Sequence, residues 1–161
     1  MSLTWGQVKT WNSGSLSAYI GTVASRRDTV VKQAGALQAR VSSFQGEGAT
    51  AEALCDQMKR AYEALTTLAD DLAEVQDAVN AAAGNISEVE GAVKNAICTA
   101  SLKGCKISDN GSVSCHVSYG AGGTAAILRA IAKVEALVQE VLALAEYADA
   151  SFVARLGSAG M

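Results

Sequence analysis

Four cysteines and one histidine are the residues of this sequence with the most varied chemistry. The cysteines are Cys55, Cys98, Cys105 and Cys115, and they allow three complete sets of disulfide pairs. A disulfide would indicate a protein that functions in an oxidising compartment, outside the cytosol. Without a bridge, the thiols would act as small apolar side chains within a core.

The last two cysteines flank a predicted β-hairpin over residues 104–117. The Asn-Gly pair at 110–111 is a strong hairpin-turn signal, because both residue types tolerate positive φ angles. A three-residue loop that begins one residue before this pair would place Cys105 opposite Cys115. A two-residue turn would instead place Cys105 opposite His116. The hairpin therefore favours a Cys105–Cys115 bridge, subject to the length of its loop.

Cys55 and Cys98 lie on what we expect to be one continuous helix. They could bond to each other only if that helix broke near Gly84, and they otherwise stay free unless Cys98 pairs with a hairpin cysteine. Cys98, the two hairpin cysteines and His116 also form a candidate Cys₃His metal set, although its spacing matches no common zinc motif. A metal-binding or redox protein built on these cysteines is therefore a rival hypothesis.

The sequence offers little catalytic machinery. Cys115 and His116 are adjacent, but neighbouring residues of a strand point to opposite faces, which works against a Cys–His catalytic pair. The glycine-rich stretch at 120–123 follows no apolar strand and lacks the lysine of a phosphate-binding loop. We therefore expect a protein that is not an enzyme and that uses no metal or cofactor.

Trp5, Trp11 and Arg27 are candidates for protein–protein contact. The two tryptophans either cover one end of a helical bundle as a hydrophobic plug or form a partner-binding surface, since tryptophan often anchors interfaces. Arg27 interrupts an apolar helix face, where it extends to solvent, pairs with Asp70 or Asp71, or belongs to an interface. The sequence leaves these alternatives open.

Long helices are the elements that must position these residues. Apolar residues recur with alternating steps of four and three positions over 16–44, 54–96 and 127–152, and Arg27 alone interrupts the three series. A sustained repeat of this kind is typical of helices that pack nearly parallel or antiparallel. The repeat passes Gly84 without a change of phase, so we expect the second helix to be continuous.

Composition also indicates an all-α fold. None of the 161 residues is proline, 5% are aromatic and half are apolar. Such a chain favours long helices that approach closely through small side chains. We predict one helical domain over 1–161, an elongated bundle with four parts: a short segment at 1–14, a long antiparallel helical hairpin over 15–101, a small β-hairpin insertion at 104–117 and a third long helix over 121–157.

Charge and hydropathy exclude several functional classes. The formal net charge of −3 argues against a nucleic-acid-binding protein, which would carry a basic stripe. No apolar run reaches the roughly 18 residues of a transmembrane helix. The first residues lack the basic and apolar regions of a Sec signal peptide, so we expect no export by the commonest route.

The turn Phe44-Gln45-Gly46 between the first two long helices resembles that of the WXG family of type VII (ESX) secretion substrates of actinobacteria and firmicutes. In that family a Trp-x-Gly occupies the corresponding turn, so Phe44 stands where the family has tryptophan. The segments 3–11 and 109–113 are similar to parts of longer actinobacterial relatives. The family's Tyr-x-x-x-Asp/Glu export motif is absent after each of the four tyrosines.

The resemblance implies a secreted or cell-envelope protein that is cytoplasmic before export. It further implies pairing with another helical protein, as a hetero- or homodimer, and contact with the secretion machinery. The export motif would then lie on the partner chain or in sequence beyond this one. The protein would then be a type VII substrate or the export and pairing domain of a larger effector. A structural or adhesive coiled-coil homo-oligomer without a secretion role is the remaining alternative.

Overall fold

The structure is a computed structural model that describes residues 2–116 and 123–158. Its elements, in chain order, are α1 (Trp5–Val8), α2 (Ser13–Ser43), α3 (Ala49–Leu102), β1 (Cys105–Ile107), β2 (Val113–Cys115) and α4 (Gly123–Ser158). The protein is mostly helical with one small antiparallel sheet, which confirms the predicted fold class at this level. The predicted boundaries at 117 and 121 lie outside the described residues.

α3 is one continuous helix of 54 residues, as the unbroken repeat predicts. It passes through Gly84, where an added Cβ would meet no atom within 4 Å. A glycine inside a helix costs about 1 kcal/mol relative to alanine, and the alanine-rich sequence around Gly84 tolerates this cost. Across the helices of the described chain, none is both long and apolar enough to cross a membrane.

The chain divides into two compact units that share α3 and α4. Unit 1 takes in the chain up to Leu16 and residues 81–154, so it contains α1, the second part of α3, the sheet and most of α4. Unit 2 takes in residues 17–80 and the end of α4 from Arg155, so it contains nearly all of α2 and the first part of α3. Each unit is described by itself below.

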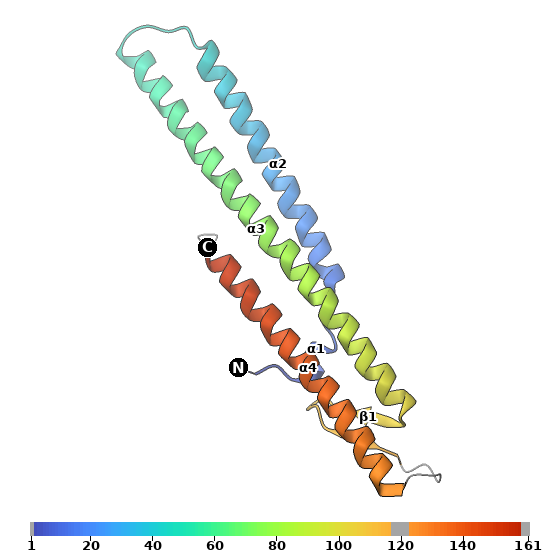
Figure 1. Ribbon diagram of the computed structural model, residues 1–161. Coiled ribbons are helices and arrows are strands. Elements are labelled where there is room, and N and C mark those ends of the chain that lie inside the picture. The colour runs from blue at the N-terminus through green and yellow to red at the C-terminus, as the bar shows by residue number, and fades with distance from the viewer. Residues whose placement is uncertain (1, 117–122, 159–161) are drawn as a thin grey trace. The chain divides into compact units, whose positions relative to one another are not determined.

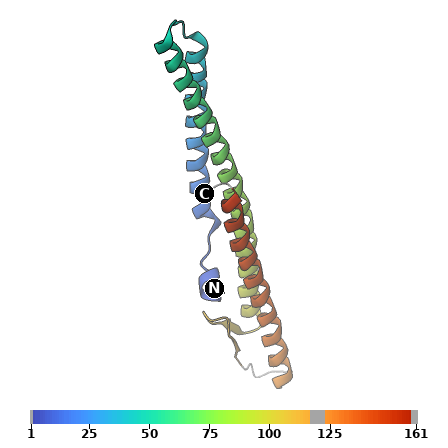
Figure 2. The ribbon, with the colours of Figure 1, turned by 90° about the vertical axis from the view of Figure 1, so that its left-hand side faces the viewer.

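In unit 2, α2 runs alongside the first part of α3 in the opposite direction, and residues 44–48 join the two helices (Figure 1). The same pairing is visible from the side (Figure 2). The buried hydrophobic side chains of this unit are Val23, Ala34, Ala69, Val75, Ala78 and Val79. Between residues 17 and 68, only Val23 and Ala34 are buried, so most of the heptad positions there remain partly open to solvent.

In unit 1, a hydrophobic core forms where α1 packs against α3 and α4. Its buried members are Trp5, Val8, Val89, Val93, Ala96, Val138, Val141, Ala145 and Ala148. A smaller cluster brings together Ala100, Cys105 and Val134. Apart from Trp5 and Cys105 these are all valine and alanine, which allows the helices to approach closely around one large indole ring.

The sheet is a two-stranded hairpin with Cys105 paired to Cys115 and Ile107 to Val113. Its loop is residues 109–111, and Gly111 closes the loop with a φ of +89°, a conformation that favours glycine. The loop is therefore the three-residue alternative. The two-residue turn, which would have paired Cys105 with His116, is wrong.

Candidate functional site

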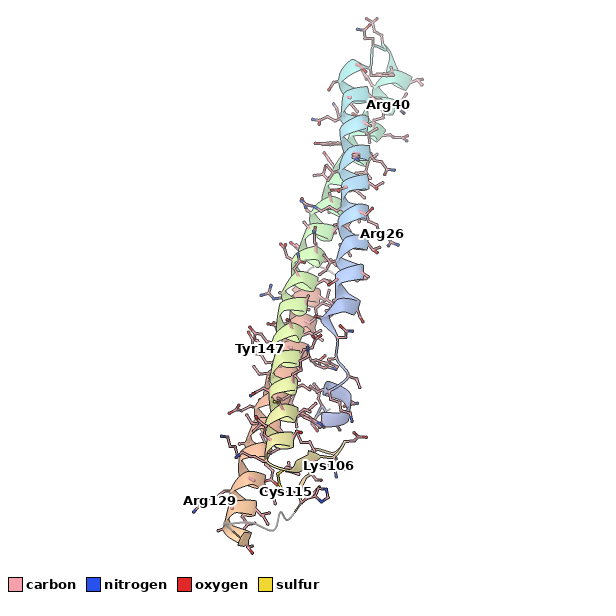
Figure 3. All side chains as sticks on the ribbon, turned by 90° about the vertical axis from the view of Figure 1, so that its right-hand side faces the viewer. Arg26, Arg40, Lys106, Cys115, Arg129 and Tyr147 are labelled. Atoms are coloured by element: carbon pink, nitrogen blue, oxygen red, sulfur yellow. A yellow bond between two sulfur atoms is a disulfide. The ribbon has the colours of Figure 1, made fainter. Side chains whose placement is uncertain are left out.

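A disulfide joins Cys105 to Cys115 across the two strands. The register explains this bond, because a three-residue loop places the two Cα atoms directly opposite each other. Figure 3 labels Cys115 on the hairpin that follows α3. The predicted Cys105–Cys115 bridge is confirmed, and the alternative in which Cys98 pairs with a hairpin cysteine is wrong.

The other two cysteines are free thiols on α3, Cys55 half-buried and Cys98 exposed. Because α3 is unbroken between them, the pairing that required a break near Gly84 does not form. Within the described ranges, no three cysteine, histidine or acidic side chains gather as a metal site would need. The candidate Cys₃His set is not assembled, since the disulfide occupies two of its thiols.

The loop of the hairpin holds α1 in place. The backbone N–H of Gly6 donates a hydrogen bond of 2.8 Å to the carbonyl oxygen of Asp109, and the Lys9 ammonium lies 2.5 Å from the Asp109 carboxylate. A Cβ at Gly6 would lie 3.1 Å from the Asp109 Cβ, so a larger residue here would require the loop to shift by a few tenths of an ångström. We call these contacts among Gly6, Lys9 and Asp109 the α1 latch.

The short helix α1 also has strong local reasons to form. Thr4 and Gln7 make a capping box, in which each side chain bonds the backbone N–H of the other residue. The box caps the helix at Thr4, so that Trp5 is the first helical residue. Trp5 is 2% exposed, and Val8, one turn later, is 1% exposed. Local capping therefore turns two large apolar side chains onto the same face, towards α3 and α4.

The three candidate interface residues lie in different environments. Trp5 belongs to the buried core, and Trp11 is half-buried and packs against that core, which agrees with the hydrophobic-plug interpretation. Trp5 is therefore not offered to a partner in this structure. Arg27 is exposed on α2 and makes no ion pair with Asp70 or Asp71.

The turn motif also has a defined geometry. Phe44 is 38% exposed in the segment between α2 and α3. A Cβ at Gly46 would lie 2.9 Å from two ring atoms of Phe44 and 3.0 Å from the Cβ of Ala51. The Phe44 ring therefore occupies the space that a side chain at position 46 would need.

A cavity of about 530 Å³ lies in unit 1 between α1, the end of α3 and β1. Its walls are formed by Trp5, Lys9, Ile97, Ala100, Ser101, Gly104, Cys105, Lys106, Ile107 and His116. The floor is mostly apolar, and the ionisable groups are Lys9, Lys106 and His116. A pocket of this size and composition is suited to binding.

The polar and sulfur-containing side chains that line the cavity are not joined to one another by hydrogen bonds. Ser101 and His116 both line it but share no hydrogen bond, and the sulfur of Cys105 is held in the disulfide. Among the described residues, Lys106 has no ion-pair partner, whereas the charge of Lys9 is neutralised by Asp109. The cavity therefore presents an unpaired cation beside an apolar floor.

Sequence reasoning did not identify Gly6, Asp109 or Ile97 as site residues. Asp109 was visible only as part of a turn, and its second role depends on α1, about a hundred residues earlier in the chain. The Thr4–Gln7 capping box was the one local signal that could have marked α1 as a formed helix. It could not have shown where that helix packs.

No protein-family model, no curated protein and no solved structure matches this chain. Its function is therefore inferred from its own residues and their geometry.

Proposed function

We propose that this protein is a type VII (ESX) secretion-associated substrate, or the export and pairing domain of a larger effector. It acts without catalysis, through helix–helix contact between unit 2 and another helical protein. The observation that carries the proposal is the open apolar seam of unit 2, defined as the apolar heptad positions of α2 and α3 between residues 20 and 68 that are not buried.

The seam exposes residues that a completed helical bundle would cover. Leu54 and Leu68 occupy heptad positions of α3 and are each 46% exposed, and Phe44 at the end of the α2 series is 38% exposed. In a pair of helices, each helix buries only the one side that faces the other helix. In a four-helix bundle, each helix packs against two neighbours and buries a wider apolar face. A partner that contributes two antiparallel helices would therefore bury these side chains.

Two further features support the proposal. The turn places the ring of Phe44 close to Gly46, at the two positions where the family resemblance implies the tryptophan and glycine of a Trp-x-Gly turn. The Cys105–Cys115 disulfide suits a protein that ends its life in an oxidising compartment, outside the cytoplasm in which it is made. In this proposal the third long helix, α4, serves the core of unit 1.

The experiment is co-expression of the full chain with the small helical protein encoded beside it, followed by native mass spectrometry. We expect a one-to-one complex, and we expect the double variant Leu54→Glu/Leu68→Glu to abolish it. Leu102→Glu is the matched control, because Leu102 is 84% exposed on the same helix but belongs to unit 1. That control should pair as the unaltered chain does.

Export distinguishes the secretion role from simple assembly. In the native host, the chain should appear in the culture medium only when the partner and the type VII apparatus are both present. A stable homodimer that pairs through the same leucines and is never exported would support the coiled-coil homo-oligomer instead. If both the unaltered chain and the Leu54→Glu/Leu68→Glu variant are monomers that bind no partner, then the secretion-associated role and the homo-oligomer are both wrong.

A further inference from the structure

The outer edge of β1 is a feature of unit 1 that helix pairing does not use. The Ser108 N–H donates to the Ser112 carbonyl at 2.9 Å, and the His116 N–H donates to the Gly104 carbonyl at 2.9 Å. These bonds identify the hydrogen-bonded pairs of the ladder. In an antiparallel ladder such pairs alternate with pairs whose backbone groups point outwards.

The alternation assigns the outward-pointing groups to Cys105 and Ile107, which pair with Cys115 and Val113 in the register. Their N–H and C=O groups point away from β2 and find no backbone partner elsewhere among the described residues. The next outward carbonyl, that of Asp109, already accepts the Gly6 N–H. This edge therefore binds one backbone donor and leaves the adjoining positions open.

The 530 Å³ cavity follows this edge and does not lie over a face of the sheet. All three residues of β1 line it, including neighbours that point to opposite faces, whereas no residue of β2 does. Ile97, which is 48% exposed, provides apolar surface beside the edge, and the buried Trp5 also lines the cavity. Open backbone groups and an adjoining apolar trough are what strand addition requires.

The side chains of β1 and its surroundings indicate which kind of peptide could bind at this edge. Cys105 is buried and Ile107 half-buried, so these side chains lie on the core face of β1, and Lys106 is exposed on the opposite face. Figure 3 labels Lys106 on the hairpin. His116 lines the same cavity, and Lys106 has no ion-pair partner within residues 2–116 and 123–158. An added strand would therefore meet apolar surface on one face and the Lys106 ammonium, with the His116 imidazole beside the cavity, on the other.

We propose that an extended peptide segment, with alternating apolar and acidic side chains, adds to the outer edge of β1 as a third strand. The hydrogen bonds come from the backbone of Cys105 and Ile107, and the peptide's acidic side chains face Lys106 and His116. An added strand rises about 3.3 Å per residue, as β1 does, so it needs about as many residues as the strand it pairs with. The three residues of β1, with one flanking residue at each end, therefore accommodate a peptide of three to five residues. This site lies in unit 1 and does not depend on the helix pairing proposed for unit 2.

Amide hydrogen exchange of the full, oxidised chain tests the backbone assignment. In the free protein, the Lys106 amide should be protected by the ladder, and the amides of Cys105 and Ile107 should exchange rapidly. The probe is the capped pentapeptide acetyl-Val-Glu-Val-Glu-Val-amide. At saturation it should protect Cys105 and Ile107 at least tenfold and leave Lys106 unchanged.

Two methylated peptides serve as matched controls, one N-methylated at the central valine and the other at the second residue. Only one edge of an added strand faces β1, so only one of the two peptides should lose binding. Loss with the methylated valine reports antiparallel addition, and loss with the methylated glutamate reports parallel addition. Equal binding of both would overturn strand addition.

The charge assignment has its own control. Lys106→Glu should weaken binding of the pentapeptide about fivefold, the scale of one exposed ion pair lost and reversed. Lys103→Glu changes the same charge on an exposed residue outside the cavity and should stay within twofold. Decanoate, a fatty-acid anion, is the alternative probe. If decanoate binds in the cavity while the amides of Cys105 and Ile107 still exchange rapidly, and the pentapeptide does not bind, then the ligand is a fatty-acid anion and strand addition is wrong.

Discussion

Units 1 and 2 are built from the same kind of helix but bury their apolar side chains to different extents. In both, apolar residues recur at heptad spacing along α3, and the buried side chains are mainly valine and alanine. Unit 1 adds a third element, α1, whose Trp5 and Val8 complete a core with α3 and α4. Unit 2 buries only two side chains over residues 17–68. A heptad repeat thus specifies a seam, and a third element decides whether the seam closes.

The largest expected effect comes from removing the plug of unit 1. Trp5→Ala should lower the free energy of unfolding of unit 1 by about 3–5 kcal/mol, because it leaves a cavity in a core of small side chains. Urea titration followed by circular dichroism and by the fluorescence of Trp11 measures the loss. Trp11→Ala, at a half-buried position, should cost less. The reverse order would contradict the assignment of Trp5 as the central core residue.

Removing the disulfide should have the next largest effect. Cys105→Ser/Cys115→Ser should lower the stability of unit 1 by about 2–3 kcal/mol, the chain-entropy value for a loop of this length. Hydrogen exchange should then show α1 opening together with the hairpin, because the α1 latch depends on the loop. Cys55→Ser/Cys98→Ser is the control and should change stability little, and thiol counting should find two free thiols in the unaltered chain.

A pair of glycine substitutions compares the two units directly. Gly6→Ala should destabilise unit 1 by about 1 kcal/mol, because the new Cβ meets Asp109 at 3.1 Å. Gly21→Ala, on α2, meets no atom within 4 Å and should stabilise unit 2 by up to about 1 kcal/mol. Thermal unfolding should show a lower melting temperature for Gly6→Ala and a higher one for Gly21→Ala than for the unaltered chain. A stabilising Gly6→Ala would show that α1 does not rest on the hairpin loop.

The smallest effect is expected on the open seam. Leu68→Gln should change the stability of the unpaired chain by no more than about 0.5 kcal/mol, since a half-exposed leucine contributes little to folding. The same change in the presence of a bound partner should weaken the complex measurably by titration calorimetry. A loss of 2 kcal/mol in the isolated chain would mean that the seam is already closed, and the contrast between the units would disappear.

The sequence predicted the features that depend on local pattern. The heptad series predicted the three long helices and the continuity of α3 through Gly84, and the Asn-Gly signal predicted the hairpin. The disulfide followed once the loop length was fixed, because the pairing of Ser108 with Ser112 makes Asp109 part of the loop.

The features that the sequence did not reveal depend on contacts between distant segments. The α1 latch joins Gly6 to Asp109, and neither residue is unusual in its own neighbourhood. The open edge of β1 follows from which ladder pairs bond, and this alternation is invisible in a three-residue strand before the register is known. The division into two units was equally hidden, since the heptad phase runs through α3 without interruption.

The continuity of α3 has a consequence for the order in which the chain folds. Starting a helix is unfavourable by a factor of roughly a thousand, whereas extending an existing helix by one residue is close to neutral. The core of unit 1 holds the second part of α3 in helical form, so the first part can grow from it by extension alone. By contrast, α2 has no such template and must start its own helix. In an unpaired chain, we therefore expect fraying to begin in α2, and the partner helix proposed above would act chiefly by lowering the cost of that start.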